Sequence, residues 1–380
     1  MQFGAQIAAA RGPLAGFLAM GVFWGSFAAL APAVKAGVGA GDAQFGLILL
    51  CGSVAAVGAM LLAPRVGGWL GGAALPIAGG AFALSALLPG QMSAPLTLAL
   101  TVIGVGATAG TLDVLMNARL SAIEAARRMP LMNLAHGLYS FTYAFAALAT
   151  GAAREAGFGP ATVFAAAAVV MLALVPLALE RDARIEGLGG SAATGPGIGV
   201  VPYIAGAVIL IGFLAEHSAE SWSALHIERT LGGSAAEGAL GPALLGLTMG
   251  VGRMFGQALV ARIPERRLMR GALMVAASGA AIAGLAPVPL IAYLGFAVLG
   301  LGASLLVPTG FALIGRLAAP EARARAIARA AALGYMGFFF GPAIIGIVAE
   351  LAGLRAAFGA VSLVLLSGLI ALALLARHDR

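Results

Sequence analysis

Long apolar stretches separated by short polar or basic loops recur along the whole chain. About twelve of these stretches reach the roughly 20 residues that a helix needs to cross the ~30 Å hydrocarbon core of a bilayer. The predicted spans are 14–32, 45–63, 73–88, 96–118, 130–152, 161–179, 201–225, 240–261, 268–285, 290–314, 326–348 and 356–376. This pattern predicts an all-α membrane protein with about 12 transmembrane helices.

The composition assigns the chain to the membrane proteins. Hydrophobic residues make up 61% of it and charged residues 10%, against roughly 45–50% and 25% in soluble domains. The lone cysteine, Cys51, excludes a disulfide framework and a cysteine-rich metal site. The sequence has no Gly-x-x-x-x-Gly-Lys phosphate loop and no His/Cys/Asp cluster with metal spacing. We therefore expect no cofactor, no bound metal, no enzymatic activity and no ATP-driven pumping.

The placement of arginines predicts how the chain is oriented. If the N-terminus is cytoplasmic, most arginines fall in loops on the cytoplasmic side, as they usually do in membrane proteins. The basic residues left in outside loops are Lys35, Arg154, Arg229 and Arg355. This asymmetry predicts an even number of helices with both termini cytoplasmic. It also accounts for the net charge of +7 without nucleic-acid binding.

A change of composition divides the chain near its middle. Residues 181–199 are rich in Gly, Ser and Pro and lack apolar periodicity, as linkers do. The two sides are similar to each other, because GVGAT at 104–108 recurs as GLGAS at 300–304, and Gly157 corresponds to Gly353 at the same offset. The sequence therefore predicts two pseudo-symmetric halves: an N-terminal six-helix bundle (1–180), a cytoplasmic linker (181–199) and a C-terminal six-helix bundle (200–380). Such a duplication, with a site between the halves, is a known transporter architecture.

Polar residues inside the predicted helices are the main functional signal. A carboxylate in lipid costs from roughly 3 to more than 10 kcal/mol, so Asp113 is expected to face a partner or a water-filled cavity. At 1.5 Å per residue, Asp113, His136 and Arg253 all fall in the cytoplasmic third, and Asn117 shares the face of Asp113. We expect a cluster of Asp113, His136 and Arg253. It could couple protons through Asp113 and His136 at an inner gate, or it could be a permanent network that holds the helices together.

A second acidic site is predicted in the outer half of the span 201–225, where Glu216 and Glu220 are one turn apart. Glu216 could bind a solute hydroxyl, carry a proton or line an outer gate. Alternatively, both acids lie at the wet mouth of the protein. Candidate solute contacts are the aromatic and amide residues Trp24, Asn133, Tyr139, Tyr143 and Tyr335. Aromatic residues at helical spacing are, however, usually packing residues.

Several motifs resemble those of the major facilitator superfamily. Its loop signature, Asp-Arg-x-Gly with further basic residues, survives in part at 64–68, but Pro64 and, in the second copy, Ala261 replace the aspartate. This replacement puts the usual salt bridge at that loop in doubt. Within the superfamily the chain resembles the fucose-permease-like carriers and their bacterial inner-membrane relatives. The residues that carry this resemblance are DVLMN at 113–117, HG at 136–137, Glu216 and WSAL at 222–225.

The resemblance implies a secondary transporter in the bacterial inner membrane that works by alternating access. It implies proton-coupled symport of a small polar organic solute, such as a sugar or a sugar derivative, with Asp113 and Glu216 as the acidic sites. The expected partners are this solute, protons and the bilayer, and we expect a monomer. Two other interpretations stay open: a proton antiporter that exports drugs or metabolites, and a non-transporting membrane sensor on a carrier fold.

Overall fold

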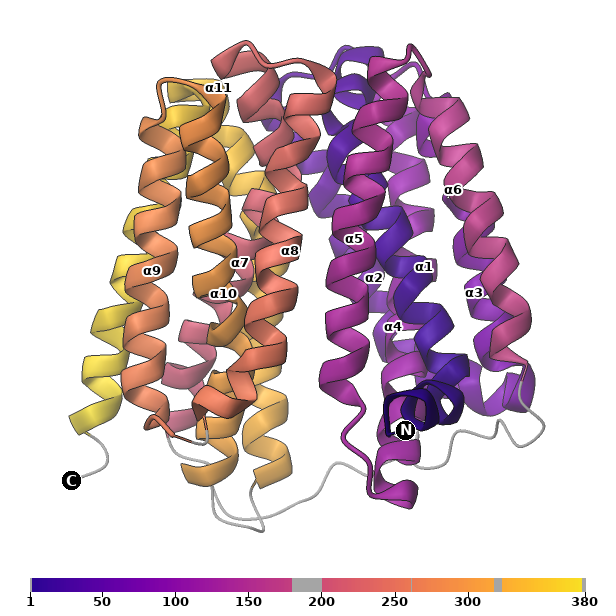
Figure 1. Ribbon diagram of the computed structural model, residues 1–380, viewed down its shortest axis with the longest axis vertical. Coiled ribbons are helices and arrows are strands. Elements are labelled where there is room, and N and C mark those ends of the chain that lie inside the picture. Colours follow the sequence, from indigo (N-terminus) through magenta and orange to yellow (C-terminus); the bar gives the residue numbers. More distant parts are fainter. Residues whose placement is uncertain (1, 180–199, 261, 318–322, 378–380) are drawn as a thin grey trace. The chain divides into compact units, whose positions relative to one another are not determined.

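The computed structural model describes residues 2–179, 200–260, 262–317 and 323–377, and every regular element in these ranges is helical. The chain forms two compact units, Met1–Gly190 and Ser191–Arg380. In Figure 1 the first unit is coloured from indigo to magenta and the second from red to yellow. The predicted linker at 181–199 lies outside the described residues.

The N-terminal unit consists of helices that run side by side (Figure 1). They are α1 (Gln2–Gly37), α2 (Asp42–Leu70), α3 (Ala74–Ser85), α4 (Pro95–Arg127), α5 (Met132–Glu155) and α6 (Pro160–Leu174). The main packing pairs are α2 with α4 and α1 with α5. Helix α1 is kinked at Ala10, where φ is −110° and ψ is 15°, so its first turns leave the axis of the long apolar segment.

The C-terminal unit repeats this plan with longer merged elements. Its helices are α7 (Val201–Leu225), α8 (Ala235–Val260), α9 (Glu265–Leu285), α10 (Pro289–Leu317) and α11 (Arg323–Arg377), and a π-helical turn, His226–Thr230, follows α7. Helix α7 packs most extensively against α11, and α10 packs against both α8 and α9. Helix α11 changes direction at Gly353, so its two parts are separate arms of one element (Figure 1).

Each predicted span falls on a helix, and α11 carries the last two spans, 326–348 and 356–376. Among the described residues, eight stretches are apolar and long enough to cross a membrane, and the longest two have 50 and 47 residues. Helices α5 and α8 are not among these eight stretches. The count of twelve crossings and the cytoplasmic position of both termini stay predictions.

The internal repeat is visible in the backbone at two corresponding glycines. Gly157 has a φ of 89° and lies between α5 and α6, whereas Gly353 has a φ of 82° and joins the two arms of α11. Only glycine adopts such positive φ values without a steric cost from a Cβ atom. The two halves therefore use the same backbone device to turn from their fifth to their sixth helical segment.

Close approach through small residues positions the helices that carry polar side chains. A Cβ atom on Gly106 of α4 would collide with the carbonyl of Gly52 on α2, and one on Gly337 of α11 would collide with the carbonyl of Leu210 on α7. Such contacts are typical of membrane helices, whose association depends on tight packing. The α7–α11 contact sets the aromatic residues of α11 directly against the polar face of α7.

Three of the basic residues that were predicted outside make local contacts at helix ends. Lys35, in the last turn of α1, forms a 2.9 Å ion pair with Asp42 in the first turn of α2. Arg154 donates a 2.7 Å hydrogen bond to the carbonyl of Ala29, and Arg355 donates one of 2.7 Å to the carbonyl that follows the end of α9. These cations are therefore engaged away from the polar clusters described next.

Candidate functional site

Helix α4 places Asp113 and Asn117 one turn apart on the same face, and both are half-buried. The Asn117 amide donates a 3.1 Å hydrogen bond to Oδ1 of Asp113 and a 2.9 Å hydrogen bond to the Asp113 backbone carbonyl. Among the described residues Asp113 forms no ion pair. Within its own unit this carboxylate therefore has a neutral amide beside it and no positive charge.

His136 lies on the neighbouring helix in the sequence but faces elsewhere. It is half-buried on α5, and its ring meets the ring of Phe17 on α1 edge to face, with 5.0 Å between centroids. No hydrogen bond or ion pair joins Asp113 to His136 within the described ranges. These two members of the expected cluster of Asp113, His136 and Arg253 therefore make no direct bond, and the cluster stays a prediction. Similar depth does not fix which way a side chain points, and α5 packs mainly on α1, with little contact to α4.

The other candidates of the N-terminal unit differ in exposure. Tyr143 is only 1% exposed and packs at the α1–α5 contact, whereas Trp24, Asn133 and Tyr139 are half-buried. The rings of Tyr139 and Tyr143 are 6.2 Å apart, and Trp24 packs edge to face on Phe23 at 5.0 Å. Tyr143 thus has the position of a packing residue. Trp24, Asn133 and Tyr139 keep surface that a solute could contact.

Polar residues are concentrated and buried on the second half of α7, in the C-terminal unit. Helices α8, α10 and α11 surround this part of α7. Its buried polar and charged residues, continuing into the π-helical turn, are Glu216, His217, Ser218, Ser221, Ser223 and His226. A run of this kind inside a membrane bundle is expensive unless its members are paired or serve a pathway.

Glu216 is paired with an arginine of the next helix. Nη2 of Arg253 on α8 lies 2.8 Å from Oε1 of Glu216, and the two side chains keep 17% and 9% of their accessible surface, respectively. Arg253 lies further from the α7–α8 turn than Glu216 does. Side chains tilt toward the N-terminus of their own helix, so in these consecutive, oppositely directed helices the two groups lean toward each other. Counting residues along each helix predicts different membrane depths for Glu216 and Arg253, although their side chains are in contact.

His217 and Glu220 form a second polar pair one turn along α7. Nδ1 of His217 lies 3.1 Å from Oε2 of Glu220, and the imidazole stacks on the ring of Phe338 on α11, with 3.8 Å between centroids and 14° between planes. His217 and Phe338 were missed as site residues. The i,i+3 spacing of His217 and Glu220 was the available signal, whereas the contact with Phe338 depends on the α7–α11 packing and has no signature in the sequence.

Tyr335, predicted as a solute contact, belongs to a run of stacked rings on the same side of α7. Its ring lies parallel to that of Phe213, at 5.3 Å and 14°, and parallel to that of Phe339, at 6.4 Å and 14°. All three residues are half-buried. The C-terminal unit therefore offers partly accessible aromatic faces next to two carboxylates and one guanidinium.

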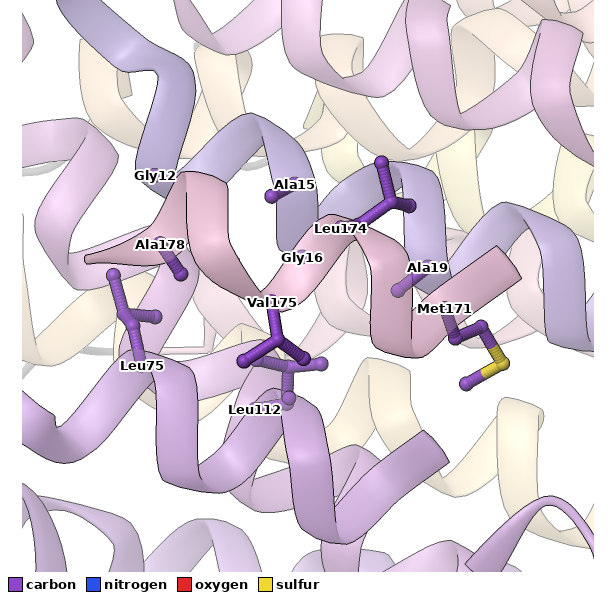
Figure 2. Close-up of a pocket in the computed structure, with 11 residues that line it drawn as sticks. Gly12, Ala15, Gly16, Ala19, Leu75, Leu112, Met171, Leu174, Val175 and Ala178 are labelled. Atoms are coloured by element: carbon purple, nitrogen blue, oxygen red, sulfur yellow. The ribbon is translucent and has the colours of Figure 1, made fainter. Parts of the chain in front are cut away.

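A crevice in the N-terminal unit lacks such chemistry. It lies between α1, α3, α4, α6 and the 3-10 segment that follows α6, and its walls are glycines and apolar side chains (Figure 2). Leu75, Leu112 and Met171 point into it, and no polar side chain lines it. It suits apolar packing, not a polar solute. Among the described residues no group of three or more His, Cys, Asp or Glu side chains could hold a metal ion.

Among the described residues, long apolar helices with buried polar pairs are typical of membrane transport proteins. The Major Facilitator Superfamily model matches residues 203–380. An uncharacterized MFS-type transporter of Yersinia pestis is 33% identical over 361 residues, which cover 92% of this chain and 91% of the relative. An uncharacterized transporter of Sinorhizobium fredii is 27% identical, with 93% and 94% covered. The chain belongs to the major facilitator superfamily.

Solved structures with a similar fold are more distant in sequence. A bacterial homolog of the human lysosomal transporter Spinster, in an inward-facing and occupied conformation, has a TM-score of 0.75 and 14% identity, with 98% of this chain and 96% of that chain covered. The nucleoside transporter NupG has a TM-score of 0.73 and 14% identity, with 97% and 98% covered. At this level of identity the likeness shows the fold alone.

Proposed function

We propose that the protein is a proton-coupled secondary transporter of a small polar organic solute. It works by alternating access of an N-terminal and a C-terminal six-helix half, 1–180 and 200–380. The observation that carries the proposal is the setting of Asp113, whose hydrogen-bond partner is the neutral amide of Asn117. An ionised carboxylate held in apolar surroundings without a positive partner is strongly disfavoured, and such groups exchange their charge for a proton. Asp113 is the proton carrier in this scheme.

Glu216 has a different role in the same scheme. Its partner is the guanidinium of Arg253, so the opposite charges of the pair cancel. Glu216 exchanges a proton only in a conformation that separates it from Arg253. The pair therefore serves as a gate and as a polar wall of the solute site, and His136 is a secondary candidate for proton coupling.

The preferred solute is a sugar or a sugar derivative, taken up across a bacterial inner membrane. The resemblance of 113–117, 136–137 and 222–225 to the fucose-permease-like carriers supports this choice. Half-buried rings, Trp24 and Tyr139 in the N-terminal unit and Tyr335 in the C-terminal unit, are each aromatic faces on which a sugar ring can lie, and carboxylates accept hydrogen bonds from its hydroxyls. The N-terminal crevice of Figure 2 is excluded as this site because its lining is apolar.

A ligand screen followed by a flux assay tests the proposal. Purified protein is screened by thermal shift against sugars, sugar acids, amino acids, nucleosides and cationic drugs. A ligand of the folded state at a hundredfold excess over Kd stabilises it by about 2.7 kcal/mol. The stabilising solute is then offered to proteoliposomes with an imposed pH gradient. Accumulation that collapses with the gradient is the expected result. Stabilisation by cationic amphiphiles alone, or flux that ignores the gradient, would contradict the proposal.

A further inference from the structure

The ion pair between Glu216 and Arg253 bears on the charge of the solutes that the site accepts. This inference rests on the proposed transport function. We propose that the site on α7, α8 and α11 accepts neutral or cationic solutes and rejects anionic ones, and that Glu216 sets this selectivity by occupying Arg253. Glu216 is thus a specificity-determining residue, distinct from the proton carrier Asp113.

The charges around the site support this selectivity. Glu216 and Glu220 place two carboxylates within one turn of α7, and the guanidinium of Arg253 faces them from α8. His217 pairs with Glu220, and α11 contributes the aromatic ring of Phe338 to this contact. The two carboxylates outnumber the single guanidinium. An arriving anion therefore meets repulsion.

An anionic solute would also need to bind the guanidinium of Arg253, which already contacts Glu216. To bind Arg253 the anion must displace Glu216 from its 2.8 Å contact, which leaves a carboxylate without its partner in a mostly buried place. A neutral hydroxylated ring avoids this penalty. Its hydroxyls can donate to the carboxylates, its apolar face can lie on Tyr335, and Arg253 keeps its partner. A cationic ring gains attraction from the excess negative charge as well.

The side chains are accessible enough for this role. The exposed fractions are 17% for Arg253, 13% for Glu220 and 9% for Glu216. The stacked rings of Phe213 and Tyr335 beside them are half-buried.

Three hexoses with the same ring and different charge test the selectivity: D-galactose, D-galactosamine and D-galacturonate. Binding to purified protein at pH 7 is measured by thermal shift and titration calorimetry. Wild-type protein is expected to bind galactose or galactosamine and not galacturonate. Glu216→Gln removes the carboxylate charge that Arg253 contacts and should increase the affinity for galacturonate about tenfold or more. Glu220→Gln removes the same charge one turn away but leaves Arg253 paired, so it is the matched control and should gain less than about threefold.

A second probe does not depend on the identity of the solute. Glu216→Ala leaves a gap beside Arg253 that acetate can fill, so acetate should raise the apparent Tm of this variant by about 2 °C or more. Acetate should leave Glu220→Ala and the double variant Glu216→Ala/Arg253→Met unchanged.

The outcomes separate the two proposals. Galacturonate binding to wild-type protein, an equal gain in Glu220→Gln, or no acetate rescue of Glu216→Ala would overturn the selectivity inference and leave proton-coupled transport standing. Binding of no hexose to any variant would overturn the sugar assignment, whereas the acetate result would still decide whether Glu216 occupies an anion-binding arginine.

Discussion

Glu216 on α7 and Arg253 on α8 form a 2.8 Å ion pair across 37 positions of sequence. The pair joins two consecutive helices of the C-terminal unit. Counting residues along each helix places Glu216 and Arg253 at different depths in the membrane, so their contact cannot be predicted from helix position alone. The ion pair is one of the contacts that join α7 to α8. The two acidic sites therefore differ in their partners: the carboxylate of Asp113 accepts a hydrogen bond from a neutral amide, whereas that of Glu216 pairs with a guanidinium.

This ion pair predicts a strong coupling between its two residues. Glu216→Gln or Arg253→Met alone leaves a mostly buried charge without its partner and should cost about 3–5 kcal/mol of unfolding free energy. The double variant leaves no charge behind, so it should recover at least about 1–3 kcal/mol of the summed loss. Chemical unfolding of the four proteins in detergent measures this cycle. Losses that simply add would show that the pair contributes nothing specific.

Two glycines on α4 provide a packing test with an internal control. A Cβ atom on Gly106 would collide with the backbone of Gly52 on α2, and backbone cannot move aside as a side chain can. Gly106→Ala should therefore destabilise the protein by about 1–3 kcal/mol. Gly104 has no atom within 4 Å of the added Cβ, so Gly104→Ala should be neutral or stabilise by up to about 1 kcal/mol. Equal apparent Tm values for the two variants would contradict the α2–α4 contact.

The turn within α11 should depend on glycine for a conformational reason. Gly353 has a φ of 82° with open space around it, so an alanine would be strained by its own backbone and not by neighbours. Gly353→Ala should cost about 1–2 kcal/mol of unfolding free energy. Gly359→Ala, a few residues on with open space and no positive φ, is the control and should cost nothing. The same loss from both substitutions would point to helix propensity or packing instead.

The spans and the repeat could be predicted because hydrophobic length and local motifs encode them. The apolar stretches from 14–32 to 356–376 all fall on helices, and the correspondence of Gly157 with Gly353 reappears as a shared positive φ. The apolar spans depend on residues that are close in sequence, and the internal repeat depends on two copies of one sequence pattern. Helix ends shifted by several residues, as at α5, where polar residues continue the helix beyond the apolar span.

The partners of the site residues could not be predicted in the same way. Depth along a helix is readable from the sequence, but the direction a side chain faces depends on which helices pack together. Asp113 and Asn117 were correctly placed on one face because a single helix holds both. Arg253 was expected beside Asp113 and His136, and its contact with Glu216 follows from the packing of α7 on α8.

The measurement that tests the central claim most directly compares accumulation with exchange in Asp113→Asn. Proteoliposomes that contain wild-type or variant protein receive the solute identified by the thermal-shift screen, once with a pH gradient and once with equal solute on both sides. Thr101→Val is the control, because Thr101 is also half-buried on α4 but bonds only to its own helix. We predict that Asp113→Asn loses gradient-driven accumulation and keeps exchange within about twofold, whereas Thr101→Val keeps both. Gradient-driven accumulation by Asp113→Asn at the wild-type level would show that Asp113 does not carry the proton.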